Sequence, residues 1–136
     1  MTRKELYSYI NAKREEERRM WLLREAIEHS RSIAGASLSG MPPEHNNDKA
    51  AKLCNDIERI DYLRARYNEA VCATNAAEFR LDSVRIRLVT ARQKAVFNAL
   101  YYVGNSIGET AALLNYSLGR IYQIRSEIDV IAAGVE

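Results

Sequence analysis

ARQKAVFNALYYVGNSIGETAALLNYSLGRIYQIRS, residues 91–126, is the stretch that decides the predicted fold. It has the pattern of three short helices joined by two turns. Val96, Leu100 and Val103 are spaced four and three residues apart, which gives the first helix one apolar face. Gly104 supplies a left-handed helix stop, and Asn115 tolerates a left-handed turn. We therefore expect helices over residues 91–103, 106–114 and 118–131.

Capping signals mark where helices begin. A Ser or Thr followed three residues later by Glu or Gln forms a capping box, in which each partner satisfies a free backbone N–H. The pattern occurs three times, at Thr2–Glu5, Thr90–Gln93 and Ser106–Glu109. The second box predicts a break or bend near residues 88–91, although a helix that continues through this point is the alternative.

Two long helices precede the break. The first is expected over residues 2–32, where apolar residues recur at helical spacing. Residues 33–47 concentrate Gly, Ser, Pro and Asn and are expected to form a loop. Asp48 then caps a second helix over residues 48–88. The predicted architecture is all-α, with a coiled-coil-like helical hairpin over residues 1–90 and a three-helix unit over 91–136.

A heptad repeat runs along the second long helix. Ten of the twelve core positions between residues 53 and 91 are apolar when Tyr is counted, which is typical of a coiled coil. A helix of this length must pack against the first helix, a second copy, or both. The residues expected to support self-association are Leu53, Ile60, Leu63, Tyr67, Leu81, Val84 and Leu88.

Charge and cysteines give weaker signals. The chain of 136 residues has 20 Lys or Arg and 18 Asp or Glu, a net charge of +2. Residues 92–126 hold four basic residues against Glu109 alone, so the local net charge is +3. KREEERR, residues 13–19, predicts a solvated helix face, with a basic face near DNA as the alternative. Cys54 and Cys72 lie too far apart on one helix to bond and are expected to be buried thiols in a reducing cytosol.

The last helix of the 91–126 stretch has two faces. Ile121, Ile124 and Ile128 form the apolar face and should pack inward. Three-helix units of this kind commonly place the last helix in the major groove of DNA, where Arg and Gln can pair with base edges. Packing without any nucleic acid is the alternative for the same spacing. The expected DNA-contacting residues are Arg92, Ser106, Ser117, Leu118, Gly119, Arg120, Tyr122, Gln123, Arg125 and Ser126.

SIGETAALLNYSLGRIYQI, residues 106–124, resembles region 4 of bacterial sigma factors. The matching positions are Ser106, Glu109, Thr110, Ala111, Leu114, Ser117 and Ile121. Together with the loop SGMPPEHNNDK at residues 39–49, the layout resembles phage late transcription regulators of the RinA/ArpU type over residues 37–128. The resemblance implies a phage or prophage DNA-binding regulator in the cytoplasm of a bacterial host. RNA polymerase is a further partner that it implies.

Three positions depart from the family pattern. Thr110 stands where an apolar residue is usual, which puts the packing there in doubt. Leu100 stands where a basic residue is common, so a phosphate contact is expected to be missing. Ile107 and Gly108 follow Ser106 in place of a Trp.

Other functional classes find little support in the sequence. His29 and His45 are not at metal-ligand spacing with the cysteines, and no phosphate-binding glycine loop occurs. We expect no enzyme activity, cofactor or membrane span. Duplex DNA and a second copy, as a homodimer or a higher homo-oligomer, are the expected partners. The alternatives are a coiled-coil module that binds RNA polymerase or a phage protein, and a small terminase-like DNA-packaging subunit.

Overall fold

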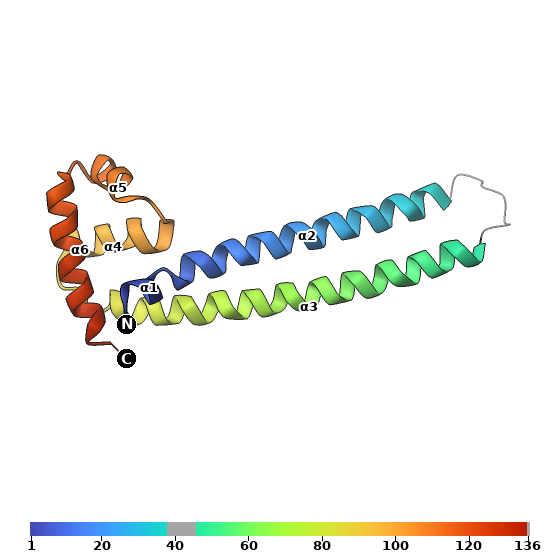
Figure 1. Ribbon diagram of the computed structural model, residues 1–136, viewed down its shortest axis with the longest axis horizontal. Coiled ribbons are helices and arrows are strands. Elements are labelled where there is room, and N and C mark those ends of the chain that lie inside the picture. The colour runs from blue at the N-terminus through green and yellow to red at the C-terminus, as the bar shows by residue number, and fades with distance from the viewer. Residues whose placement is uncertain (38–45, 136) are drawn as a thin grey trace. The chain divides into compact units, whose positions relative to one another are not determined.

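The computed structural model describes residues 1–37 and 46–135, and side chains within them at 1–32 and 50–135. These described residues form helices and contain no strand (Figure 1), so the predicted all-α class is confirmed. The loop predicted over residues 33–47 lies outside the described residues at 38–45, and its two ends are helical. Because α3 begins at Asn46, Asp48 lies inside that helix, and its predicted role as the N-cap is wrong. The elements in order are α1 (Arg3–Leu6), α2 (Ser8–Ser37), α3 (Asn46–Arg85), α4 (Ala91–Phe97), the π-helix η2 (Asn98–Val103), α5 (Ile107–Leu114) and α6 (Leu118–Ala133).

The chain divides into two compact units. Unit 1 comprises residues 1–13 and 73–136, and unit 2 comprises residues 14–72. This division differs from the predicted boundary after residue 90. The reason is that the end of α3 supplies Leu81 and Val84, and the connection after it supplies Leu88, to the same buried core as α4 and α6. The break after α3 is present, because the helix ends at Arg85 and α4 begins at Ala91.

All three predicted capping boxes are formed. Thr2, Thr90 and Ser106 each accept a hydrogen bond from the backbone N–H three residues later, and the side chain of that later residue accepts one in return. Because each box satisfies donors that a helix start leaves free, it fixes where the helix begins. The box at Thr2 starts only a four-residue helix, since the chain turns at Tyr7 before α2. The predicted helix over residues 2–32 is thus two helices, and the second extends to Ser37.

Helix α1 contacts α6 within unit 1. The Arg3 guanidinium donates to the Asp129 carboxylate, and Leu6 is completely buried. The Tyr7 ring meets the Tyr101 ring edge-on, with centroids 5.0 Å apart. Edge-to-face aromatic pairs of this kind stabilise a fold by more than the burial of their surface area alone. The N-terminal residues are therefore part of the core that positions α6.

The helix predicted over residues 91–103 changes type part-way. It is α-helical to Phe97 and π-helical from Asn98 to Val103. Because i→i+5 bonding widens the turn, the residues that follow are rotated out of α-helical register. Tyr101 is consequently buried, whereas Val103 is 69% exposed, so the predicted inward position of Val103 is wrong. Gly104 ends the segment with φ of +88°, as the sequence predicts.

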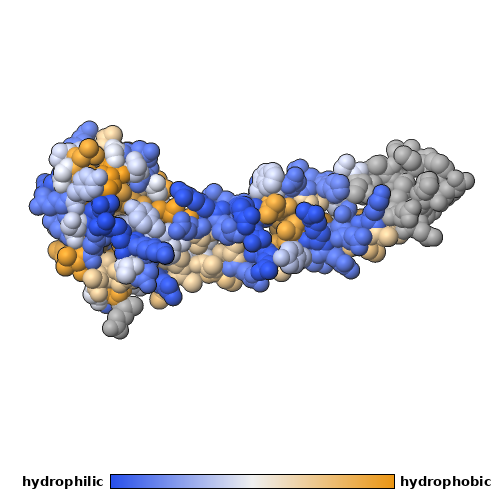
Figure 2. Space-filling model, viewed as in Figure 1, coloured by the Kyte–Doolittle hydropathy of each residue, from blue (hydrophilic) through white to orange (hydrophobic). Residues whose placement is uncertain are grey.

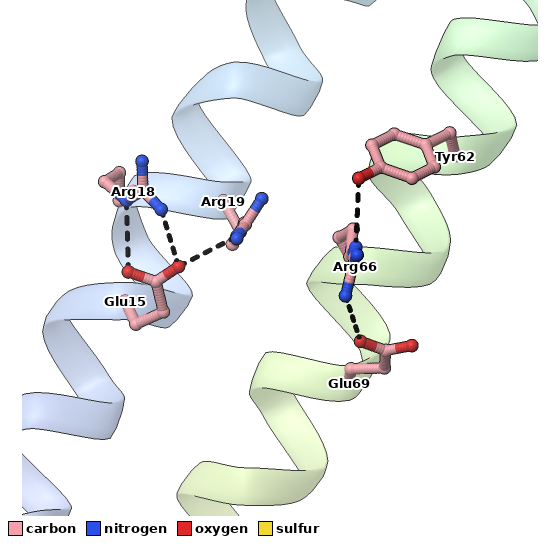
Figure 3. A network of polar contacts seen from close by, with 6 residues as sticks. All are labelled: Glu15, Arg18, Arg19, Tyr62, Arg66 and Glu69. Atoms are coloured by element: carbon pink, nitrogen blue, oxygen red, sulfur yellow. Dashed lines mark hydrogen bonds and ion pairs between the residues drawn. The ribbon is translucent and has the colours of Figure 1, made fainter.

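Unit 2 contains stretches of α2 and α3 that run side by side (Figure 1). Leu23 on α2 and Leu63 on α3 are buried there. Polar contacts run along the outside of each helix (Figure 3): Glu15 accepts from Arg18 and Arg19 on α2, each at 2.8 Å at the closest. The predicted solvated charge run is consistent with these exposed pairs. The expectation for the cysteines is wrong, because Cys54 and Cys72 are both exposed.

Candidate nucleic-acid interface

The candidate site is built on α5, the turn after it, and α6. Asn115 ends α5 with φ of 57° and ψ of 39°, the left-handed conformation that the sequence predicts. Ser117 then caps α6, and its side chain accepts the Arg120 backbone N–H at 3.2 Å. A turn this short leaves little freedom in the angle between the helices. The orientation of α6 is therefore set by local backbone chemistry as well as by packing.

The inner face of α6 is anchored in the core. Ile121, Ile124 and Ile128 are each at most 1% exposed, which confirms the predicted apolar face. Ala111 on α5 is buried in the same cluster, where a small side chain allows two helices to approach closely. Burial of three isoleucines on one stripe fixes the rotation of α6 about its axis. The opposite face must then point to solvent.

The outer face of α6 carries five of the predicted DNA-contacting residues. Leu118 is 54% exposed and Tyr122 is 49% exposed. Gly119, Gln123 and Ser126 are also exposed. No Asp or Glu occurs between residues 110 and 126, so this face has no carboxylate in its first two turns. Figure 2 shows apolar atoms among polar ones on the surface of these C-terminal helices.

Gly119 has open space beside it. A Cβ atom built there would meet nothing within 4 Å, and the backbone φ is not in the left-handed region. Glycine inside a helix costs about 1 kcal/mol relative to alanine. Nothing in the described part of the chain therefore requires glycine at this position. Close approach of another molecule to the backbone of α6 is a physical reason for a glycine at this position.

Two predicted residues from different helices share one hollow. Arg92 and Arg120 both line it, together with Gln93, Ile124 and Glu127. The Arg120 Nη1 donates to Gln123 Oε1 at 3.0 Å, and the Gln93 Nε2 donates to Glu127 Oε2 at 3.0 Å. Gln93 was predicted only as a capping partner and Glu127 not at all, so neither was expected in this hollow. The spacing of Arg120, Gln123 and Glu127, three and four residues apart, would have placed them on one stripe.

Arg125 differs from the other predicted contacts. It is half-buried, with its guanidinium carbon 5.0 Å above the Tyr122 ring. Its Nε is buried and makes no hydrogen bond among the described residues. Burial raises the pKa of the neighbouring Tyr101 phenol above its ordinary value. Arg125 thus supports Tyr122 at the edge of the face and does not project freely from it.

Ser106 is committed to its helix cap. Its backbone N–H donates to Glu109 Oε2 at 3.3 Å, so a carboxylate occupies the start of α5. A carboxylate there competes with phosphate for the positive end of the helix dipole. The start of α6 has no acidic residue in its first turn. Ser117 at α6 is therefore better suited than Ser106 to meet an anion.

Most of the residues predicted to support self-association are buried by contacts within the single chain. Leu63, Leu81, Val84 and Leu88 are each at most 8% exposed, and Ile60 and Tyr67 are half-buried. Leu53 is 38% exposed. The heptad stripe predicted on α3 thus forms a buried face within the single chain. Phe79 on α3 and Ile86 just after its end are exposed apolar residues on the opposite side, and their exposure was not predicted.

Within the part of the chain that the structure describes, no three His, Cys, Asp or Glu side chains come together as metal ligands would. None of the described helices is both long and apolar enough to cross a membrane. No protein-family model matches this chain, and the searches of curated proteins and of solved structures found no match.

Proposed function

We propose that this protein binds duplex DNA sequence-specifically as a transcription regulator of the phage or prophage type. On this proposal, α4 to α6 act as a helix-turn-helix unit, with residues 117–131 in the major groove. The α2 and α3 helices form the antiparallel hairpin that precedes the unit. A recognition helix must be held rigidly on one side and be free on the other. The observation that carries the proposal is that α6 meets both requirements, with three buried isoleucines opposite an exposed face that has no acidic residue in its first two turns.

The exposed groups divide into two kinds of contact. Gln123 and Arg120 lie within hydrogen-bonding distance of each other on the outer face, and these side chains pair with adenine and guanine edges. On this proposal the phosphate contacts come from Ser117, Tyr122, Ser126 and Arg92, and such contacts position a protein without reading sequence. Leu118 can meet a thymine methyl group. Gly119 allows the backbone of α6 to come close to the bases.

Two of the predicted contacts change role. Arg125 acts indirectly, because its guanidinium packs on the Tyr122 ring and its Nε is buried. Ser106 acts as the cap of α5, since Glu109 already occupies its backbone N–H. Replacing either residue would disturb the unit itself. Neither is therefore a clean probe of DNA contact.

The test is titration of labelled duplex with variants of the outer face. Gln123→Ala removes a proposed base contact and should cost about 1–3 kcal/mol for the preferred site, with less effect on unrelated duplex. Asn11→Ala, an exposed amide on α2, is the matched control. If Gln123→Ala prefers the preferred duplex over the unrelated one as strongly as Asn11→Ala does, Gln123 is not on the reading face.

A second candidate is an interaction module for RNA polymerase or another protein. The observation that favours it is the exposure of apolar side chains on α5 and α6, with Leu113 at 66% and Val130 at 75%. Leu113→Glu should abolish such an interaction and leave duplex affinity unchanged. Loss of duplex affinity in Gln123→Ala alone would favour DNA binding.

A further inference from the structure

Three buried polar atoms of unit 1 have no hydrogen-bond partner among the described residues. They are the hydroxyl oxygen of Tyr101, the Nε of Arg125 and the Oδ1 of Asp129. Tyr101 lies on η2, and the other two residues lie on α6. Buried polar groups in folded proteins nearly always make a hydrogen bond, because they give up their bonds to solvent when they are buried. Three such atoms in one unit therefore need an explanation.

The three side chains lie close to one another. Asp129 follows Arg125 by four residues on α6, so the two are neighbours on one side of the helix. Tyr101 belongs to the same buried core as Ile128, the residue before Asp129. The charges of Asp129 and Arg125 both act on the Tyr101 phenol. We call Tyr101, Arg125 and Asp129 the buried polar cluster.

The Tyr101 hydroxyl is a hydrogen-bond donor in apolar surroundings. Its side chain is completely buried, and its ring meets the Tyr7 ring and the Phe97 ring with centroids 5.0 Å and 5.2 Å apart. Burial, the largest cause, raises the pKa of this phenol above its ordinary value. The hydroxyl therefore keeps its proton at neutral pH, and that proton needs an acceptor.

Other contacts hold the two charged members of the cluster. Arg3 Nε donates to Asp129 Oδ2 at 3.1 Å, which leaves Oδ1 on the buried side. The Arg125 guanidinium carbon lies over the Tyr122 ring, 5.0 Å from its centroid, which leaves Nε on the buried side. The cluster thus presents two donors, the Tyr101 O–H and the Arg125 Nε–H, and one acceptor, Asp129 Oδ1. A group that satisfies all three must accept twice and donate once.

Charge and size narrow the choice of that group. An anion would meet the Asp129 carboxylate, and a cation would meet the Arg125 guanidinium, so the group is neutral. It is also small, because Tyr101 is completely buried. Water can accept two hydrogen bonds and donate two, and buried waters typically make about three bonds to groups that are otherwise unsatisfied. The donor and acceptor set of the cluster matches a single water molecule.

We propose that the buried polar cluster binds one water molecule, which accepts from the Tyr101 hydroxyl and from Arg125 Nε and donates to Asp129 Oδ1. The water joins η2 to α6 beneath the outer face. It keeps the Nε of Arg125 turned inward while the guanidinium packs on Tyr122. Tyr101 is therefore a positioning residue for a ring on the outer face of α6. The inference goes beyond the proposed DNA binding and does not depend on it.

The first test is a crystal structure of the full chain at a resolution that shows ordered water. One peak of density should lie within about 2.7–3.2 Å of all three cluster atoms. Crystals of Tyr101→Phe, which keeps the ring and lacks the hydroxyl, should show the peak weakened or lost. Direct hydrogen bonds among the three side chains, or density that contacts only one of them, would overturn the proposal.

The second test is a double-mutant cycle on urea unfolding, followed by circular dichroism. Tyr101→Phe and Arg125→Met each remove one bond to the water and should each raise the unfolding equilibrium constant about fivefold. Together they should raise it by clearly less than the product of the two factors, because the first substitution already loosens the water. Tyr9→Phe removes a hydroxyl of the same unit from outside the cluster, and its factor should simply multiply with that of Arg125→Met. A simple product for Tyr101→Phe with Arg125→Met would contradict the shared water.

The third test reports the position of Arg125. The nuclear magnetic resonance signals of the Tyr122 ring protons depend on the guanidinium that packs on the ring. Tyr101→Phe should shift these signals, because Arg125 loses its inward anchor, whereas Tyr9→Phe should leave them in place. Unchanged Tyr122 signals in both variants would show that Tyr101 does not position Arg125.

Discussion

The side chain of Gln93 joins the start of α4 to the middle of α6, because its Nε2 donates to Glu127 Oε2 at 3.0 Å. The Oε1 atom of the same side chain accepts from the Thr90 backbone N–H as part of the capping box. One amide therefore both begins a helix and holds the next long helix beside it. Glu127 also brings a carboxylate into the hollow that Arg92 and Arg120 line.

Glu127 should weaken the attraction of this face for phosphate. Glu127→Gln removes the negative charge and keeps an amide oxygen that can accept from Gln93. We expect duplex affinity to rise several-fold at low salt, with a smaller gain at high salt. Titration of labelled duplex at several salt concentrations measures this. Glu78→Gln is the matched control, and an equal gain in both variants would mean that net charge alone is responsible.

Gly119 gives a test that separates stability from binding. Gly119→Ala meets no atom within 4 Å, so it should raise the free energy of unfolding by up to about 1 kcal/mol. The added methyl group lies on the proposed contact face and should reduce duplex affinity about tenfold or more, since a close contact would have to open. Thermal melting and duplex titration measure the two effects.

Gly108 is the control for this experiment, because it holds the same second position in α5 that Gly119 holds in α6. The nearest atom to a Cβ there is Ser106 Oγ at 4.0 Å. Gly108→Ala should also stabilise the fold but leave duplex affinity unchanged. Unchanged affinity in Gly119→Ala would place the bases away from the start of α6.

Much of unit 1 follows from its sequence because its signals are local. Capping boxes at Thr2, Thr90 and Ser106 depend on residues three apart, and all three are formed. The left-handed conformations at Gly104 and Asn115 depend on one residue each. Helix starts and stops of this kind need no knowledge of tertiary contacts.

The features that were missed depend on long-range packing. The π-helical turn at Asn98–Val103 buries Tyr101 against Tyr7, a residue from the other end of the chain. The heptad on α3 correctly marks an apolar stripe, but periodicity does not say whether that stripe meets the same chain or another copy. Burial of Leu81 and Val84 in unit 1 answers this for the C-terminal part of α3.

Thr110 is accommodated in the core, although sigma region 4, which this stretch resembles, usually has an apolar residue at this position. It is completely buried, and its Oγ1 donates to Ser106 O at 2.8 Å. Thr110→Val keeps the shape and removes this hydrogen bond, so the free energy of unfolding should fall by about 0.5–1.5 kcal/mol. Chemical denaturation measures it. A variant as stable as the unmodified protein would show that the hydroxyl contributes nothing.

Glu15 gives a pH dependence in unit 2. Hydrogen bonds from Arg18, the larger cause, and from Arg19 lower the pKa of its carboxyl from 4.5 to about 2. A lowered pKa contributes stability above the unfolded value, and that stability is lost as pH falls from about 4.5 toward about 2. The carboxyl is exposed to solvent, so the effect should be small.

The measurement is thermal melting of Glu15→Gln and of the unmodified protein at pH 7 and pH 3. The variant should melt slightly lower at pH 7, and the difference should narrow at pH 3. Glu17→Gln removes a carboxylate from the same helix and serves as the control. A difference that widens on acidification would contradict the assigned direction of the pKa shift.

The most direct test of the central claim is selection of bound duplexes from a random-sequence pool at a fixed, moderate salt concentration. If α6 reads the major groove, repeated selection should enrich one sequence motif. The enrichment should be lost in Gln123→Ala and kept in Asn11→Ala. A pool that remains random after selection with the unmodified protein would contradict sequence-specific DNA binding.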